Sequence, residues 1–592
     1  MCGILGLINL NKNIEINLKS FKASMELLNH RGPDNMGIWS NSKITLGHRR
    51  LSIIDLSING NQPIIDNKTG AVMIFNGMIY NYIELKKKLL ALGYSFQGTS
   101  DTEVLFYSII EWNEKAFNYL NGIWSLAIFF PSENKLLLSR DRFGVKPLYF
   151  INKQDQFAFS SEPKALLNLY PEFKEVNEDS LFNFFQNSEI NSSKKSFYKN
   201  IYLFPPSSYG IYDLNKKKLN LHKYWEYPKK INDKINDHEA FEQFTNLFNN
   251  SVELRLRGDV PCALSLSGGL DSTAILTSIN NINKKITCFT SVYEKDISRE
   301  LYYAKEAISH TNSKLVTVLT KSNQWLENIK KIVWHLDGPS YSPAIIPHWN
   351  LLKEMKKKNF RVLLEGQGAD ELFAGYPQYY AINLIKNLNN KVFFNKLFAS
   401  MKSFGLKTSL TWIVWEMLPY NIKLFYKKLK FRDKDYLNAR ERLIDDHSKN
   451  ILPGLLNYGD ALSMAHSIET RNPFLDYRLV EWAFKLPENL VFNNFETKSI
   501  LRKYLSKNKQ IKIANRNDKI GYNTPLNIWI QNDKFTIKKI LLKNKKNLHK
   551  FTKNQDIENL IEKSIKGNVF SQNFLFKILT THLWIEECIE KK

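Results

Sequence analysis

The sequence predicts two domains: a strand-rich α+β domain over residues 2–226, and an α/β domain with a doubly wound parallel sheet over residues 241–592. Short apolar runs bounded by glycine, asparagine, proline or charge predict the strands of the first domain. From residue 261 onward, apolar strands alternate with helical stretches, which is typical of a parallel sheet. The polar stretch 227–240 predicts a linker between the two domains.

The individual elements follow from local patterns. In the first domain the apolar runs predict strands at 71–75, 124–130 and 135–139, with a helix over 82–92. In the second domain, strand 261–266 leads into a glycine-rich turn at 267–272 and a helix from residue 273. Further strands are expected at 285–292, 314–319 and 361–364. Helical periodicity predicts a helical insertion over 377–450 and a helical C-terminal region.

Composition excludes several classes of protein. Hydrophobic residues make up 43% of the chain and charged residues 24%, which excludes a disordered chain, a collagen-like fibre and a coiled-coil rod. The formal net charge of +25 raises the possibility of an anionic partner such as nucleic acid. However, the excess lysines are scattered in short runs at 86–88, 216–218 and 356–358, a pattern typical of solvated faces. We therefore expect no nucleic-acid partner.

Cysteine usage and hydropathy indicate the cellular setting. The four cysteines form no C-x-x-C pair, and no histidine pair has the spacing of a zinc-binding helix. No run of 18 apolar residues occurs, so no transmembrane helix or membrane partner is expected. The N-terminus shows no signal-peptide pattern. These features predict a reduced, cytoplasmic protein.

Cys2 follows the initiator methionine, whose removal would place a thiol and a free α-amine on one residue. An α-amine has a near-neutral pKa, so it can accept the thiol proton. A cysteine at position 2 is by itself more often a coincidence. Here four motifs follow it in order: HRGPD at 30–34, GHRRLSI at 47–53, FNG at 75–77 and SDTE at 100–103.

This set of motifs resembles the class II glutamine amidotransferase domain, an N-terminal-nucleophile glutaminase with an αββα sandwich. The resemblance implies that Cys2 attacks the side-chain amide of glutamine, forms a thioester and releases ammonia. The glutamine-binding residues that it implies are Arg50, Ile53, Asn76, Gly77 and Asp101. Arg50 would bind the glutamine carboxylate and Asp101 the α-ammonium, while Asn76 and the Gly77 N–H would form an oxyanion hole. Segments 140–149 and 160–166 also match the family, and we expect them to support the fold and contact the second domain.

One position departs from the family pattern. A glutamate that helps to hold the α-ammonium usually follows Asn-Gly, whereas this chain has Met78. A charge-assisted hydrogen bond contributes about 1.5–3 kcal/mol, so glutamine is expected to bind more weakly here. The substitution Met78→Glu is therefore predicted to lower the KM for glutamine.

The turn SGGLDS at 267–272 stands between an apolar strand and a helix, where glycines allow close backbone approach and N–H groups face an anion. No Walker A motif occurs anywhere in the chain. The turn resembles the pyrophosphate loop of ATP pyrophosphatases, which cleave ATP to AMP and pyrophosphate. Further motifs follow at 364–376 (LEGQGADELFAGY), 463–476 (SMAHSIETRNPFLD), 496–502 (ETKSILR) and 518–525 (DKIGYNTP).

With the first domain, these motifs resemble the glutamine-hydrolysing asparagine synthetase family over nearly the whole chain. The ATP-binding residues implied are Leu266, Ser267, Gly268, Gly269, Asp271, Ser272, Val292, Glu365 and Gly366. Asp271 and Asp370 would be ligands of Mg²⁺, which prefers one or two carboxylates plus phosphate oxygens. Lys498 would neutralise charge on the pyrophosphate leaving group.

The implied reaction has two halves joined by an interior passage for ammonia. ATP activates a carboxylate as an acyl-adenylate, and ammonia from glutamine displaces AMP to give an amide. The implied partners are small molecules: glutamine, ATP and the acceptor. By resemblance alone, a homodimer is also expected.

The acceptor stays open between two interpretations: aspartate, giving asparagine, or another carboxylate such as the uronic acid of a surface polysaccharide. Gln367 stands where many asparagine-forming members have a glutamate proposed to act in the synthetase chemistry. Residues 337–344 occupy the place of a threonine and an arginine for aspartate, and no arginine occurs between Arg299 and Arg361. The insertion 377–450 is either helical padding or a wall of the acceptor pocket.

Two other classes of protein are less compatible with these motifs. An RNA-binding or RNA-modifying pyrophosphate-loop protein would fit the charge, but the Cys2 glutaminase pattern argues against it. A scaffold with inactive sites is disfavoured because Cys2, Arg50, Asp271 and Asp370 are all present.

Overall fold

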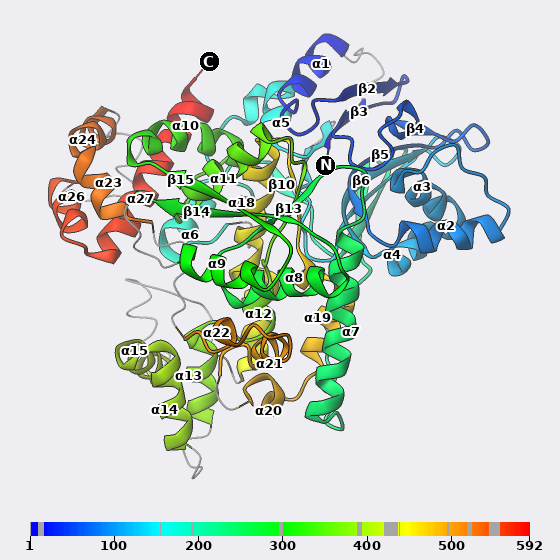
Figure 1. Cartoon of the computed structure of the whole chain (residues 1–592). Helices are drawn as coiled ribbons and strands as arrows, with labels where there is room; N and C mark the ends of the chain where they lie inside the picture. The colour runs from blue at the N-terminus through cyan, green and yellow to red at the C-terminus, as the bar shows by residue number, and fades with distance from the viewer. Residues whose placement is uncertain are drawn as a thin grey trace.

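The computed structural model describes residues 2–9, 17–153, 156–190, 194–294, 300–386, 393–418, 436, 438–493, 496–517, 524–543 and 557–591. The N-terminal part packs beside the parallel sheet of the second part, and the helices α13–α15 project at the far end (Figure 1).

The N-terminal part contains two six-stranded antiparallel sheets. The first has the order β10-β8-β9-β1-β3-β2, and its strands are β1 (Gly3–Asn9), β2 (Asn35–Ser40), β3 (Ile44–Arg50), β8 (Tyr149–Lys153), β9 (Gln156–Ser160) and β10 (Tyr202–Leu203). The second has the order β12-β11-β7-β6-β5-β4, and its strands are β4 (Ile64–Ile65), β5 (Val72–Ile79), β6 (Gly122–Phe130), β7 (Lys135–Arg140), β11 (Ser208–Asp213) and β12 (Lys218–Lys223).

Alternation of side chains explains how the two sheets stack. Successive residues of a strand point to opposite faces, so Ile4 of β1 and Val72 of β5 enter a core between the sheets. On the outer face of the first sheet, Leu5 packs with α1 (Leu18–Glu26) and α5 (Pro163–Leu169). On the outer face of the second, Phe75 packs with α2 (Tyr82–Ala91) and α3 (Asp101–Trp112). The αββα sandwich is thereby confirmed.

The second part is built on a five-stranded parallel sheet of order β15-β14-β13-β16-β17. Its strands are β13 (Cys262–Ser265), β14 (Thr287–Tyr293), β15 (Lys314–Thr320), β16 (Val362–Leu364) and β17 (Glu469–Arg471). The first four match predicted strands, whereas β17 was not expected. The strand order reverses between β13 and β16, which opens a crevice at their carboxyl ends where α/β sheets bind ligands.

Helices cover both faces of this sheet, as the prediction of a doubly wound fold requires. One face carries α7 (Asp237–Arg255), α8 (Leu270–Asn281), α9 (Glu300–Ser309), α19 (Tyr477–Phe484) and α21 (Ser499–Lys507). The other carries α10 (Trp325–Leu336), α11 (Ile345–Lys357), α18 (Leu452–Met464) and α27 (Val569–Trp584). Helix α7 begins inside the expected linker because Asn236 and Glu239 form a capping box that starts it at Asp237.

The described residues of 377–450 are largely helical, as their periodicity predicts. They form α13 (Pro377–Lys386), α14 (Phe393–Phe404), α15 (Leu406–Met417) and α17 (Ala439–Asp445). Ala381, Leu384 and Ile413 make a small core of their own between α13 and α15. The C-terminal helices α23 (Leu526–Asn532), α24 (Lys534–Lys543) and α26 (Ile557–Ile565) pack near α27.

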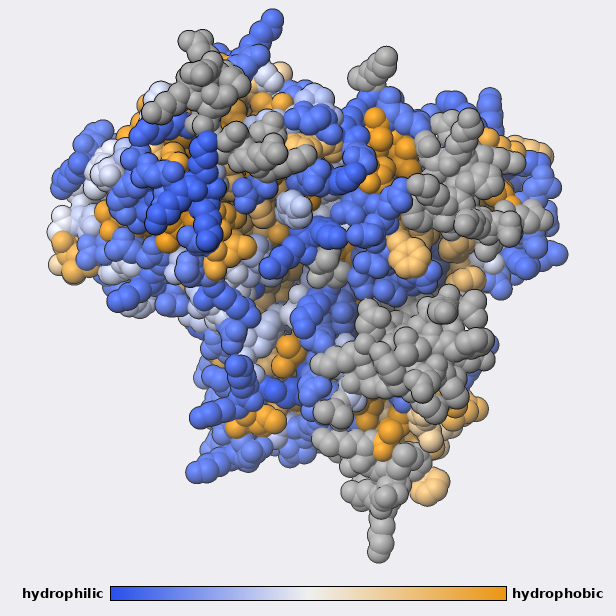
Figure 2. All heavy atoms as spheres, turned by 180° about the vertical axis from the view of Figure 1, so that it is seen from behind, coloured by the Kyte–Doolittle hydropathy of each residue, from blue (hydrophilic) through white to orange (hydrophobic). Residues whose placement is uncertain are grey.

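The surface is largely hydrophilic on the face shown in Figure 2, where apolar residues gather only in small groups. The lysines of the runs at 216–218 and 356–358 are all exposed, as a solvated face requires. Within the described part of the chain, no helix is both long enough and apolar enough to cross a membrane.

Candidate active site

A small pocket lies at the N-terminus, between the start of β1 and the ends of β3 and β5. It brings together five residues that the sequence predicted for glutamine chemistry: Cys2, Arg50, Ile53, Gly77 and Asp101. The sixth, Asn76, is fully buried beside them, and the Cys2 backbone N–H donates to its Oδ1 at 3.0 Å. Residues from four separate segments of the first domain therefore converge at one point.

Cys2 is held at the head of β1 by contacts on both sides of its peptide. Arg31 Nε donates to the Cys2 carbonyl oxygen at 3.1 Å. The Cys2 side chain is buried, and burial raises the pKa of its thiol above the usual value. The thiol therefore needs a local base to become a nucleophile.

Arg50 is wrapped by the loop that follows β3. Its Nη1 donates to the Ser57 carbonyl oxygen at 2.6 Å and to Asn61 Oδ1 at 2.8 Å. A Cβ at Gly60 would lie 2.1 Å from Arg50 Nη2, so only glycine allows this close approach. The loop thereby fixes the guanidinium at the pocket wall.

Asp101 and Met78 form another part of the wall. Asp101 is the first residue of α3, and its Oδ2 accepts a hydrogen bond from the Ile79 N–H at 2.9 Å. Burial raises the pKa of Asp101 to about 6, against the effect of that hydrogen bond. Met78 is buried and also lines the pocket.

Glu469, a residue from the second domain, lines this pocket as well. It lies on β17, and its carboxylate pairs with Arg471 Nε at 2.5 Å. Arg471 Nη1 in turn donates to the Arg255 carbonyl oxygen at 2.8 Å. The motif at 463–476 is visible in the sequence, but nothing in its pattern indicates that one of its carboxylates faces Cys2.

A larger cavity of about 260 Å³ lies in the crevice at the carboxyl ends of β13 and β16. Six of the nine residues predicted to bind ATP line it: Ser267, Gly269, Asp271, Ser272, Glu365 and Gly366. Asp370, Lys498 and Gln367 line it too. Segments far apart in the sequence therefore meet around one cavity.

The other three predicted ATP-binding residues do not line this cavity. Leu266 is in the core, and its N–H donates to the Phe289 carbonyl oxygen at 2.9 Å. Gly268 makes the turn with φ +67°, and its carbonyl accepts from Arg516 Nη1 at 3.0 Å. Val292 lies on the neighbouring strand β14, paired with Leu319.

Lys498 links the two predicted metal ligands. Its Nζ lies 2.6 Å from Asp271 Oδ1 and 2.8 Å from Asp370 Oδ1. Burial lowers the pKa of Lys498, but the two carboxylates outweigh this effect and hold it above its usual value. A Cβ at Gly375 would lie 1.7 Å from Asp370 Oδ1, so a glycine is needed beside this cluster. No group of three or more potential metal ligands occurs among the residues that the structure describes.

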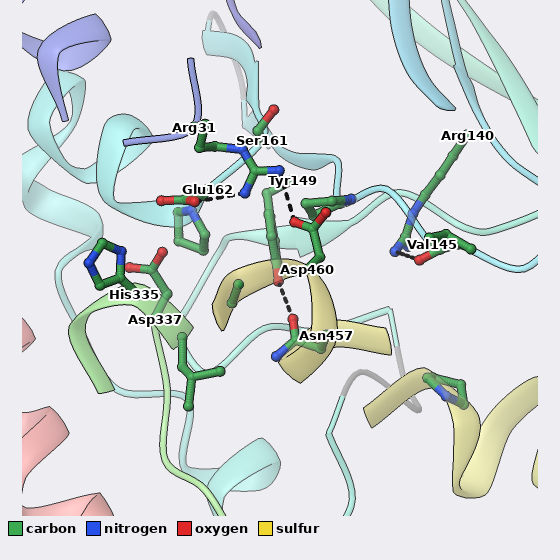
Figure 3. A pocket seen from close by; sticks show the side chains of 16 residues that line it. Arg31, Arg140, Val145, Tyr149, Ser161, Glu162, His335, Asp337, Asn457 and Asp460 are labelled. Atoms are coloured by element: carbon green, nitrogen blue, oxygen red, sulfur yellow. Dashed lines mark hydrogen bonds and ion pairs between the residues drawn. The ribbon is translucent and has the colours of Figure 1, made fainter. Parts of the chain in front are cut away.

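A buried network of charges joins the two domains (Figure 3). Asp460 of α18 accepts from Arg31 Nη2 at 2.8 Å and from Lys146 Nζ at 3.0 Å. Lys164 Nζ donates to Asp337 Oδ2 at 2.7 Å. The expectation that segments 140–149 and 160–166 contact the second domain is confirmed.

Of the motif at 518–525, residues 518–523 lie outside the described part of the chain.

Comparison with known families adds the decisive observation. The model of the glutamine amidotransferase domain matches residues 1–225, and that of asparagine synthase matches residues 243–586. The chain belongs to the asparagine synthase family. As a member of this family it is a ligase that forms an amide with ATP and the nitrogen of glutamine.

Three relatives show how similar this asparagine synthase family member is to other named proteins. Asparagine synthetase [glutamine-hydrolyzing] 1 of Bacillus subtilis is 28% identical, over 98% of this chain and 93% of its own length. A putative asparagine synthetase 2 of Methanocaldococcus jannaschii is 32% identical, over 66% of this chain and 78% of its own. The amidase chry2 of Gibberella zeae is 26% identical, over 85% of each chain.

Proposed function

We propose that this chain converts aspartate to asparagine and releases AMP, pyrophosphate and glutamate. One observation carries the proposal: a Cys2 pocket suited to glutamine and a cavity suited to ATP occur together in one chain. The Bacillus subtilis relative, matched over 98% of this chain, is named a glutamine-hydrolysing asparagine synthetase.

In the first half of the reaction, Cys2 attacks the side-chain amide of glutamine. Once Met1 is removed, the Cys2 α-amine accepts the thiol proton, which offsets the raised pKa of the buried thiol. Asn76 and Gly77 stabilise the oxyanion, while Arg50 and Asp101 hold the carboxylate and ammonium of glutamine.

In the second half, the acceptor carboxylate attacks the α-phosphorus of ATP and pyrophosphate leaves. Ser267 and Gly269 before α8, and Ser272 in its first turn, cradle the phosphates, since backbone N–H groups at the start of a helix face an anion. Lys498 offsets the charge that develops on the leaving pyrophosphate.

The residues present fit a magnesium ion that accompanies ATP. Asp271 and Asp370 both contact Lys498 Nζ, so their carboxylates converge on the same side of the cavity. Two carboxylates with phosphate oxygens are a donor set that Mg²⁺ prefers. When bound, the ion would offset the negative charge of the phosphates.

The proposed passage of ammonia runs by the neighbouring strands β16 and β17. Glu469 on β17 lines the glutamine pocket, and Glu365, directly after β16, lines the ATP cavity. The two strands are neighbours, because the Glu365 N–H donates to the Arg471 carbonyl oxygen at 3.0 Å. A sealed crossing at this strand pair would keep ammonia away from bulk water.

A uronic acid is the second candidate acceptor. Gln367 lines the ATP cavity where many asparagine-forming members have a glutamate, and Phe404 of the insertion lines it as well. This contact supports a role of the insertion in shaping the acceptor site. Arginines do reach the cavity from elsewhere in the chain, namely Arg502 and Arg516, and they are candidates for holding an acceptor carboxylate.

The location and assembly of the chain are part of the same proposal. All four cysteines are free thiols, which supports a reducing compartment such as the cytoplasm. A homodimer stays a prediction.

The acceptor is tested with purified protein, ATP, Mg²⁺ and glutamine, offered aspartate and then uronic acids, while AMP is measured. The proposal predicts AMP release that depends on aspartate. AMP release with a uronic acid but none with aspartate would replace the first candidate by the second. The substitution Asp271→Asn is the control, because it should suppress AMP release with every acceptor.

A further inference from the structure

Among the residues that the structure describes, no lysine or arginine pairs with the Glu365 carboxylate in the ATP cavity. Glu365 follows β16 directly, and its side chain is only 6% exposed. Among the described residues no hydrogen bond reaches its carboxylate, and its charge-pair contact is His348 Nε2 at 3.5 Å. His348 is itself neutral, because burial lowers its pKa to about 4.

This environment differs from that of the other acids placed at the ATP phosphates. Lys498 contacts both Asp271 and Asp370, so each of these carboxylates has a cationic partner. Glu365 has no such compensation, and burial raises its pKa to about 8. A buried carboxylate without a cation is costly to maintain, and such groups cluster at sites of proton transfer.

The second half of the reaction requires a group that accepts a proton. The lone pair of ammonia forms the new C–N bond, and the bond between the acyl carbon and the AMP oxygen breaks. The nitrogen then carries a positive charge until it loses a proton. The Gln367 amide lines the same cavity but cannot accept that proton, and Lys498 already carries one.

We propose that Glu365 is the general base of amide formation and accepts the proton that the attacking nitrogen loses as AMP departs. The proposal rests on the function proposed above. The Glu365 backbone N–H donates to β17, the strand whose Glu469 lines the glutamine pocket. Glu365 therefore lies at the strand pair where we propose that ammonia crosses.

The charged and titratable groups around Glu365 come from several elements. His348 faces it from α11. Asp271 of α8 packs against the adjacent Gly366, where a Cβ would lie 2.8 Å from the Asp271 Cβ. Asp370 and Lys498 line the same cavity. His348 in turn acts on His466, after α18, whose pKa is lowered to about 3, chiefly by burial. Burial alone accounts for the shift at Glu365.

The substitution Glu365→Gln separates activation of the acceptor from amide formation. Exchange of labelled pyrophosphate into ATP in the presence of aspartate measures adenylation and needs no nitrogen. Asparagine formation from ammonia measures the full reaction. In the variant we expect asparagine formation to fall at least ~100-fold further than exchange does, the usual contribution of a general base.

Two results would overturn the assignment of Glu365. If Glu365→Gln formed asparagine within threefold of the wild-type rate, amide formation would not depend on Glu365 as a base. An equal loss of exchange and asparagine formation would make Glu365 a substrate-binding residue. Aspartate-dependent exchange by the wild type tests the proposed function separately, because it does not involve Glu365 as a base.

A second readout is the pH dependence with hydroxylamine, which unlike ammonia is largely unprotonated at neutral pH. Wild-type hydroxamate formation should rise as pH increases through about 8, where Glu365 ionises. The Glu365→Gln variant should lose this rise. Glu354→Gln, on the exposed end of α11, is the matched control and should keep it. The same rise in wild type and Glu365→Gln would contradict the proposal.

Discussion

At the scale of single residues, the Cys2 pocket combines groups whose charge states depend on burial. The sequence predicts Cys2, Arg50 and Asp101 from their motifs, because each lies in a short run with a characteristic order. It does not predict that the Cys2 N–H bonds Asn76 Oδ1 or that Glu469 joins the pocket, since these contacts depend on tertiary packing.

The raised pKa of Asp101 predicts an acid limit for the use of glutamine. A carboxyl with a pKa of about 6 is ionised above that pH and protonated below it. Protonation removes the negative charge that holds the glutamine ammonium, so kcat/KM for glutamine should fall as pH drops below about 6. Initial rates of glutamate release across pH 5–8 measure it, and a flat profile down to pH 5 would contradict the role of Asp101.

Met78→Glu is predicted to lower the KM for glutamine about tenfold, because it adds a charge-assisted hydrogen bond to the ammonium. Met78 is buried in the pocket wall, so a new carboxylate there would face the ligand. Met78→Gln is the control for size without charge. An unchanged or raised KM in Met78→Glu would show that this position does not contact the ammonium.

At the scale of elements, β17 and α18 connect the two domains. Strand β17 consists of Glu469, Thr470 and Arg471 and has no apolar residue to mark a buried strand, which is why the sequence did not predict it. Helix α18 (Leu452–Met464) begins just beyond the helical stretch predicted over 377–450, and its partners were not predicted either. Asp460 pairs with Arg31 and Lys146 across the interface, and no local pattern links residues so far apart in the chain.

Asp460→Asn should weaken the contact between the domains. It removes the buried anionic partner of Lys146 and one of the two buried anionic partners of Arg31, which keeps Glu162; breaking a buried pair typically costs about 3–5 kcal/mol. The melting temperature should fall, and glutamate release should exceed amide formation because the crossing is less well sealed. Both are measured on the purified variant.

Glu327→Gln on α10 is the control for Asp460→Asn, since it removes only an exposed pair with Lys331 and should leave the melting temperature unchanged. If Asp460→Asn melted like this control and kept one glutamate per amide, the interface would not depend on Asp460.

At the scale of the whole molecule, the sequence predicts three strands of one antiparallel sheet, four of the five strands of the parallel sheet and the turn at the ATP cavity, because apolar runs and the 267–272 turn are local signals. The +25 charge lies on exposed lysine runs and scattered side chains rather than in either pocket. The placement of Glu469 on β17 and of Glu365 directly after the neighbouring strand β16, each lining a different pocket, emerges only when distant segments fold together.

Cys2→Ala tests most directly whether two separate sites cooperate in one amidotransferase. It removes the nucleophile of the first pocket and leaves the ATP cavity intact. The account predicts that asparagine formation from glutamine is abolished, while formation from ammonia stays within about threefold of wild type. If both activities fell together, the assignment of two sites joined by ammonia would be wrong.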